Sequence, residues 1–205
     1  MAEVLHAPAP SASSAPAPIP PVGPPPGAEL RALESVQGAI ARPSVVRAAR
    51  AMSLFGEHAG GWLALGTLGA LTDCRRRRDW LTATAAVALA HGASIGVKRV
   101  VRRPRPDHPQ VQVLAGTPSR LSFPSAHATS TTTAAVLFGA LLGRPLAAAV
   151  VPPMLLSRLV LGVHYPTDVL AGSLLGAAVA AAARRRRPSL RRISKRGVLQ
   201  RRLSR

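Results

Sequence analysis

The sequence of 205 residues contains few aromatic, acidic and cysteine residues. It holds three Phe, two Trp and one Tyr, which leaves few of the stacking surfaces that proteins use to bind single-stranded nucleic acid. Cys74 is the only cysteine, so the chain forms no intramolecular disulfide. These shortages exclude a disulfide-stabilised scaffold, and stability must come from packing or from a bilayer.

Small apolar residues and basic residues are abundant instead. The apolar fraction is 47%, too high for a disordered polyelectrolyte, and Ala, Leu, Val and Gly favour close packing of helices in membranes. Charges bound five largely uncharged runs, at residues 59–72, 80–97, 121–143, 145–167 (interrupted by Arg158) and 169–183. We therefore expect an all-α, integral-membrane helical bundle with about five transmembrane helices, although several runs are shorter than the roughly 20 residues of a typical span. A soluble helical bundle is the alternative, because the mean hydropathy is only +0.19.

The two ends of the chain differ in composition from its centre. Residues 1–27 contain nine prolines and are predicted to form a disordered or polyproline-like tail. Residues 29–55 show helical spacing of apolar positions and are divided by Pro43, which predicts two short amphipathic helices. These helices either lie on a membrane surface or pack on the protein itself. We expect a membrane-embedded domain at 28–183 and a basic cytoplasmic tail at 184–205.

The basic residues predict an orientation in the membrane. Arg75–Arg78, Arg144 and the eleven Lys and Arg of residues 184–205 fall on one side of a five-span arrangement, and the positive-inside rule makes that side cytoplasmic. The loop from Lys98 to Phe123 and the turn from His164 to Asp168 then face outward together. The outward loop is itself basic, which weakens the charge contrast. The sequence thus predicts a multi-pass protein of the cytoplasmic membrane.

Two polar blocks border the second and third runs. The first extends from Lys98 through Arg105 to Pro106 and is strongly basic, as expected of a phosphate site, a solvated face or a membrane-surface anchor. The second extends from Ser122 to His127 and contains Pro-Ser before an apolar stretch. That pattern is typical of a helix start, where unpaired N–H groups and the helix dipole bind anions, or of an ordinary cap.

A third block contains Arg158, His164 and Asp168. Arg158 lies within an otherwise apolar run, where a charge costs about 2.5–3.5 kcal/mol on insertion scales, so it is a functional candidate. His164 and Asp168 are four residues apart, which on a continuous helix places them on one face. Pro166 fits the first turn of the last helix. A carboxylate that binds one imidazole nitrogen leaves the other free as a nucleophile.

Together the three blocks resemble the three-part motif of the type 2 phosphatidic acid phosphatase family. One departure is Ala126, where the family usually has Gly. The resemblance implies an all-helical bundle, no metal or other cofactor, and a phosphohistidine intermediate. It also implies a site in which His164 is the nucleophile, Asp168 orients it and His127 protonates the leaving alkoxide, while the phosphate is bound by Lys98, Arg105, Ser125, Ala126 and Arg158.

A narrower resemblance rests on Ser53-Leu-Phe-Gly-Glu57-His58, the run from Lys98 to Pro106 and the stretch that begins at Ser122. These segments look like the actinobacterial phosphatases that act on decaprenylphosphoryl-5-phosphoribose. The resemblance implies hydrolysis of this lipid-linked phosphomonoester to decaprenylphosphoryl-ribose in arabinan precursor synthesis. A polyprenyl diphosphate phosphatase and a phosphatidic acid or phosphatidylglycerophosphate phosphatase are the alternatives. The expected partners are the lipid-linked substrate and the membrane.

Nucleic-acid binding and a metal site are two other functions that the sequence could suggest. The isoelectric point near 12.0 suggests nucleic-acid binding, but anchoring of the basic tail to anionic lipids explains it more simply, and no nucleic-acid partner is expected. A metal site could use His108, His127, His164 and Asp168, although the surrounding Lys and Arg favour an anion. Asp107 and His108 are predicted to be loop residues, and Glu57 and His91 to be interior polar residues. The sequence leaves the oligomeric state open.

Overall fold

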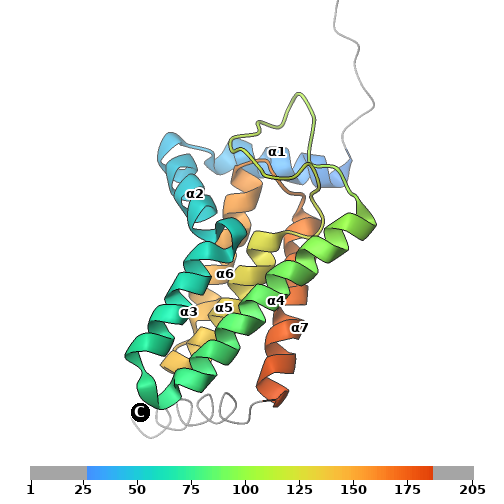
Figure 1. Cartoon of the computed structure of the whole chain (residues 1–205). Coiled ribbons are helices and arrows are strands. Elements are labelled where there is room, and N and C mark those ends of the chain that lie inside the picture. The colour runs from blue at the N-terminus through green and yellow to red at the C-terminus, as the bar shows by residue number, and fades with distance from the viewer. Residues whose placement is uncertain (1–26, 187–205) are drawn as a thin grey trace, which may run out of the picture.

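The computed structural model describes residues 27–186, which form helices joined by turns and one long loop (Figure 1). The elements are α1 (Ala28–Ile40), α2 (Pro43–Gly56), η1 (Glu57–Ala59), α3 (Gly60–Thr72), η2 (Cys74–Arg76), α4 (Arg77–Val101), α5 (Ala126–Leu142), α6 (Leu146–Val160) and α7 (Pro166–Arg186). Within this part of the chain there is no strand, and the all-α prediction is confirmed. The predicted tails at 1–27 and 184–205 lie outside the described residues, except for Gly27 and the last turn of α7.

Helix α5 is the centre of the bundle and packs against α4, α6 and α7 (Figure 1). Two glycines of α7 allow the closest approach. A Cβ on Gly172 would lie 2.5 Å from the carbonyl oxygen of Ser125, and one on Gly176 would lie 2.4 Å from that of Thr129. The abundance of small residues therefore serves close packing of helices, as the composition predicts.

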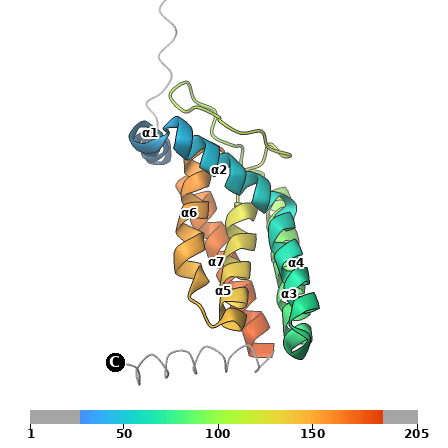
Figure 2. The same cartoon turned by 90° about the vertical axis from the view of Figure 1, so that its left-hand side faces the viewer.

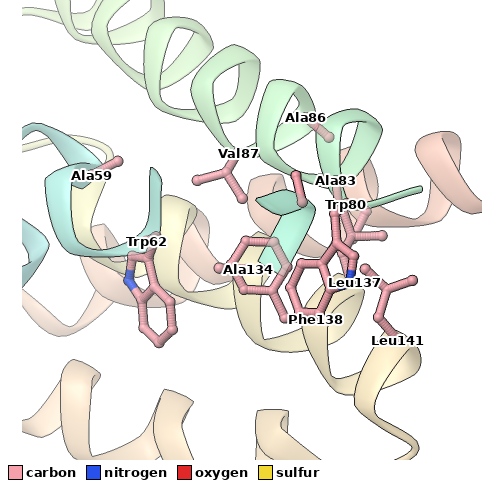
Figure 3. Close-up of a cluster of buried hydrophobic side chains, with 12 residues drawn as sticks. Ala59, Trp62, Trp80, Ala83, Ala86, Val87, Ala134, Leu137, Phe138 and Leu141 are labelled. Atoms are coloured by element: carbon pink, nitrogen blue, oxygen red, sulfur yellow. The ribbon is translucent and has the colours of Figure 1, made fainter. Parts of the chain in front are cut away.

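An aromatic and aliphatic core joins α3, α4 and α5 (Figure 3). Trp62, Trp80 and Phe138 are its largest members, and the ring centroids of Trp80 and Phe138 lie 5.3 Å apart. On the outside of the bundle, α3, α4 and α7 expose large apolar side chains, namely Leu65, Leu68, Leu71, Leu81, Leu89, Leu170 and Leu174. An exposed apolar surface of this kind is expected of a bundle that faces lipid.

Two helical segments are long and apolar enough to cross a membrane, Cys74–Val101 and Pro166–Arg186. Helix α6 is apolar but shorter. At 1.5 Å per residue, α5 is roughly 25 Å long and α3 roughly 20 Å, against a hydrocarbon core of about 30 Å. Length and hydropathy thus give two candidate spans among the described residues.

Helices α1 and α2 lie across one end of the bundle, where both contact α6 (Figure 2). Leu33 of α1 and Ala49 of α2 are buried, and Ala49 packs with Val160, Leu161 and Val163. The prediction of two amphipathic helices divided at Pro43 is confirmed. Of the two alternatives, a position on the membrane surface and packing on the protein itself, the structure shows the second for their apolar faces.

The chain reverses direction at each turn between α3 and α7, so its basic turns gather at one end of the bundle (Figure 1). The α3–α4 turn, the α5–α6 turn and the end of α7 lie together at this end. The side chain of Arg76 donates a hydrogen bond to the carbonyl of Leu141, which ties the first of these turns to the end of α5. The loop after α4 and the turn before α7 lie at the opposite end, with α1 and α2.

Candidate active site

A cavity of about 320 Å³ lies at the end of the bundle that α1 and α2 cover. Its walls come from α2, η1, α4, α5, α6, the loop after α4 and the turn before α7. Six of the eight residues predicted for the site line it, and these are Lys98, Arg105, Ala126, His127, Arg158 and His164. The other two, Ser125 and Asp168, are fully buried beside this wall.

His164 and Asp168 meet although they do not share a continuous helix. Asp168 lies in the first turn of α7, whereas His164 precedes that helix by two residues. The imidazole Nδ1 lies 3.5 Å from Asp168 Oδ2, and among the described residues it has no closer polar partner. The backbone N–H of Tyr165 donates to the same carboxylate oxygen at 2.8 Å. The carboxylate therefore faces Nδ1 and leaves Nε2 directed elsewhere.

The Nε2 atom of His164 faces a cation. It lies 3.2 Å from Nη1 of Arg105, and the His164 side chain is almost completely buried. Burial lowers the pKa of His164 to about 3, with the charges of Arg105 and Lys98 acting in the same direction and Asp168 opposing them. The imidazole is therefore neutral at pH 7. With its Nδ1 hydrogen toward Asp168, Nε2 carries the lone pair.

Lys98 and Arg105 bring positive charge to the cavity, and their hydrogen-bond partners among the described residues are uncharged groups. Lys98 Nζ donates to the carbonyls of Leu121 at 3.1 Å and Ser122 at 2.8 Å. Arg105 Nη1 donates to the carbonyl of Val163 at 2.6 Å. Burial lowers the pKa of Arg105 to about 10, so its guanidinium stays charged at pH 7. No carboxylate of residues 27–186 forms an ion pair with either side chain, and an anion such as phosphate is the complementary ligand.

Ser53 of α2 holds the third cation and the second histidine. Its hydroxyl accepts from Arg158 Nη1 at 3.0 Å, and its carbonyl oxygen lies 2.9 Å from His127 Nε2. A carbonyl accepts only, so His127 Nε2 carries a hydrogen. Gly56 makes room for this ring, because a Cβ there would lie 2.6 Å from His127 Cδ2. In the sequence Ser53 marked only the narrower resemblance, and no local pattern identified it as a contact of the site.

The start of α5 supplies backbone donors. Ser125 is the N-cap, and its hydroxyl accepts from the N–H of Ala128 at 3.4 Å. The N–H groups of Ala126 and His127, in the first turn, have no intrahelical acceptor, and both residues line the cavity. The helix start predicted from the Pro-Ser sequence is therefore present, with Ser125 in the capping position and Ala126 at the cavity wall. Phosphate binding by Ser125 itself stays a prediction.

Arg103 is a contact of the site that is not among the predicted site residues. Its Nη1 donates to Asp168 Oδ1 at 3.1 Å and to Thr167 Oγ1 at 2.7 Å. Its Nη2 forms an ion pair with Glu29 of α1, and its guanidinium lies 4.0 Å from the centre of the Tyr165 ring. Arg103 thus fixes the Asp168 oxygen that does not face His164. In the sequence it was one arginine among several in a basic run, and nothing local distinguished it.

Of the polar residues outside the three motifs, Glu57 lies elsewhere than predicted. Glu57 is exposed rather than interior, because η1 interrupts the helical path between α2 and α3 at this point, and His91 is half-buried. Asp107 and His108 lie in the loop after α4, as expected. The alternative metal site is not assembled, since residues 27–186 contain no group of three or more His, Cys, Asp or Glu side chains placed to hold an ion.

Comparison with known sequences identifies relatives of this architecture. The family profile of the PAP2 superfamily matches residues 79–192. The decaprenylphosphoryl-5-phosphoribose phosphatase of Mycolicibacterium smegmatis is 60% identical over 148 residues, which cover 72% of this chain and 82% of that protein. The enzyme of the same name from Mycobacterium tuberculosis is 54% identical over 157 residues, which cover 76% of this chain and 89% of that protein.

Solved structures share the fold at lower sequence identity. The crystal structure of Aquifex aeolicus LpxE aligns with a TM-score of 0.64 at 21% identity and covers 76% of this chain and 93% of that one. The PAP2-type phosphatidylglycerolphosphate phosphatase of Bacillus subtilis aligns with a TM-score of 0.62 at 22% identity, covering 76% of this chain and 84% of that one. These likenesses support the arrangement of the helices.

Proposed function

The chain belongs to the PAP2 superfamily. From that premise we propose that it is a metal-independent membrane phosphatase, which hydrolyses a lipid-linked phosphomonoester through a phosphohistidine intermediate. The observation that carries this proposal is the juxtaposition at His164. Its buried, neutral imidazole faces Asp168 through Nδ1 and Arg105 through Nε2, in a cavity that Lys98 and Arg158 also line. A neutral nucleophile beside several cations suits attack on a phosphate dianion.

The substrate that we propose is decaprenylphosphoryl-5-phosphoribose, with decaprenylphosphoryl-ribose and inorganic phosphate as products. Two relatives that are 54% and 60% identical to this chain carry the name of that phosphatase. A terminal phosphate offers three peripheral oxygens to the cations of the cavity, whereas a diester offers fewer charged oxygens and a bulky second substituent. The enzyme should therefore remove the 5-phosphate and leave intact the diester that joins the sugar to the lipid.

The first chemical step transfers the phosphoryl group to the enzyme. Nε2 of His164 attacks phosphorus, a P–N bond forms and the P–O bond to the sugar breaks. Asp168 stabilises the positive charge that develops on the ring. His127 enters this step as an imidazolium, with a hydrogen on each ring nitrogen. Its Nε2–H donates to the Ser53 carbonyl, and its Nδ1–H is the proton that passes to the leaving alkoxide, which leaves His127 neutral. The cations stabilise charge on the transferring group.

The second step regenerates the enzyme. A water molecule attacks phosphorus of the phosphohistidine, and the P–N bond breaks as inorganic phosphate forms. The neutral His127 left by the first step takes the proton of that water, so one residue serves as acid and then as base. Ser53 keeps His127 and Arg158 in place through both steps, because it contacts both side chains.

We also propose that α3 to α7 span the cytoplasmic membrane five times, with the cavity at its outer face. The alternating direction of these helices and the collection of basic turns at the opposite end support this orientation. Residues 28–183 would form the membrane-embedded catalytic domain, and residues 184–205 a cytoplasmic tail. The three shorter helices would span with help from flanking residues or local thinning of the bilayer.

A comparison of substrates tests the proposed function. Release of inorganic phosphate by the purified enzyme is measured in excess chelator with the phosphoribose lipid, polyprenyl diphosphate and phosphatidic acid. We expect the highest kcat/KM for the phosphoribose lipid and no turnover by His164→Ala. A higher kcat/KM for either of the other lipids would refute the proposed substrate, and turnover by His164→Ala would refute the proposed nucleophile.

A further inference from the structure

The cavity continues beyond the cations along one face of α4. His91, Ile95 and Lys98 are spaced i, i+4 and i+7 and all line it, as expected of one helix face. Lys98 lies at the phosphate end. His91 lies seven residues earlier, about 10 Å along the helix axis toward the middle of the bundle. The region around His91 is therefore the part of the cavity that lies nearer the middle of the bundle than the phosphate site does.

Two more polar side chains from η1 line this part of the cavity, Glu57 and His58. The rings of His58 and His91 lie 6.4 Å apart. His58 and the following Ala59 have φ angles of 49° and 59°, in the left-handed region that residues other than glycine rarely adopt. Strain of this kind persists where the surrounding structure holds a functional geometry. Here the strained turn aims η1 at the cavity.

The proposed reaction uses none of these three polar groups, of which Glu57 and His58 are exposed and His91 is half-buried. No described residue forms a hydrogen bond or ion pair with the side chain of Glu57, His58 or His91, and the hydrogen bond that Ser94 donates to His91 goes to its backbone carbonyl. The Nδ1 atom of His91 is buried without a partner among the described residues. His91 lies within α4, and an ionisable group within a membrane helix is costly and is therefore a functional candidate. A ligand with donors and acceptors would satisfy them.

We infer that Glu57, His58 and His91 form a subsite for hydroxyl groups that lie between the terminal phosphate and the lipid of the substrate, as the hydroxyls of a sugar do. This inference rests on the proposed function. A carboxyl group and two imidazoles offer both acceptors and donors to hydroxyl groups. A hydrocarbon chain in the same place would leave them unpaired, and a second phosphate would meet the acidic Glu57. The subsite thus favours lipids that carry phosphate on a hydroxylated group.

Three lipids that differ in the number of these hydroxyls test the subsite. The phosphoribose lipid has two hydroxyls between its terminal phosphate and its lipid, phosphatidylglycerophosphate has one, and phosphatidic acid has none. The full-length enzyme and the variants Glu57→Ala and His91→Ala are assayed for kcat/KM with each lipid. We expect the ratio of kcat/KM for the phosphoribose lipid to that for phosphatidic acid to fall about tenfold in each variant, the loss typical of one or two hydrogen bonds. The ratio for phosphatidylglycerophosphate should fall less.

His108→Ala is the matched control, because His108 lies in the loop after α4 and does not line the cavity. Its ratios should equal those of the wild type. Equal losses on all three lipids, or unchanged ratios in both variants, would overturn the subsite. Wild-type inactivity on the phosphoribose lipid would refute the proposed substrate alone, and the subsite would then be judged by the ratio of phosphatidylglycerophosphate to phosphatidic acid.

Discussion

Replacement of Arg103 by Gln removes the guanidinium that binds the carboxylate behind the proposed nucleophile. Arg103 Nη1 lies 3.1 Å from Asp168 Oδ1, and the Asp168 side chain is 0% exposed. A hydrogen bond to a charged group is worth about 1.5–3 kcal/mol. Because the Arg103 side chain is 27% exposed, solvent screening places the loss near the lower end of that range. This corresponds to roughly a tenfold decrease in kcat.

The loss should appear in kcat rather than in KM, since Arg103 does not line the cavity. Lys at this position keeps the charge and should recover part of the activity. Arg102→Gln is the control, because Arg102 is exposed and its Nε donates only to the carbonyl of Arg99 among the described residues. Steady-state kinetics with each purified variant measures the effect. An unchanged kcat for Arg103→Gln, or an equal loss for Arg102→Gln, would refute this role.

Three further predictions concern the site and its orientation. Asp168→Asn should lower kcat roughly 10³-fold or more, because the charge that stabilises the imidazolium is lost; near-normal kcat in the folded variant would contradict it. Ser53→Ala removes the hydroxyl that accepts from Arg158 but keeps the carbonyl, so kcat/KM should fall about three- to tenfold, and an unchanged value would exclude Ser53 from the site. The exposed thiol of Cys74 should escape an impermeant reagent in intact cells and react after lysis; labelling of sealed cells would invert the topology.

The order of the helices follows from the sequence because charges and prolines bound the apolar runs. Each of the five runs corresponds to one helix, and Pro43 and Pro166 begin helices. The ends of the runs predict the ends of the helices less exactly. Helix α5 begins at Ala126, five residues after its run begins, because the preceding residues form part of the loop. Helix α6 ends at Val160, and Gly162 then adopts a φ of 67° in the turn that leads to His164.

The members of the site that the sequence did not reveal make long-range contacts. Ser53 meets Arg158 across 105 positions, and Arg103 meets Asp168 across 65. Neither contact has a local pattern, because a serine in an amphipathic helix and an arginine in a basic run are common surface residues. Glu57 is exposed rather than interior because the backbone turns at His58. Such features depend on how distant elements pack.

The most direct measurement is the identification of the phosphorylated residue. The enzyme is mixed with substrate labelled in the terminal phosphate, quenched within its first turnover under conditions that preserve phosphohistidine, and analysed by mass spectrometry of its peptides. We predict label on His164 in the wild type and none in His164→Ala, with Asp168→Asn labelled more slowly. Label on another residue, or rapid product formation with no labelled enzyme at any time, would contradict the proposed mechanism.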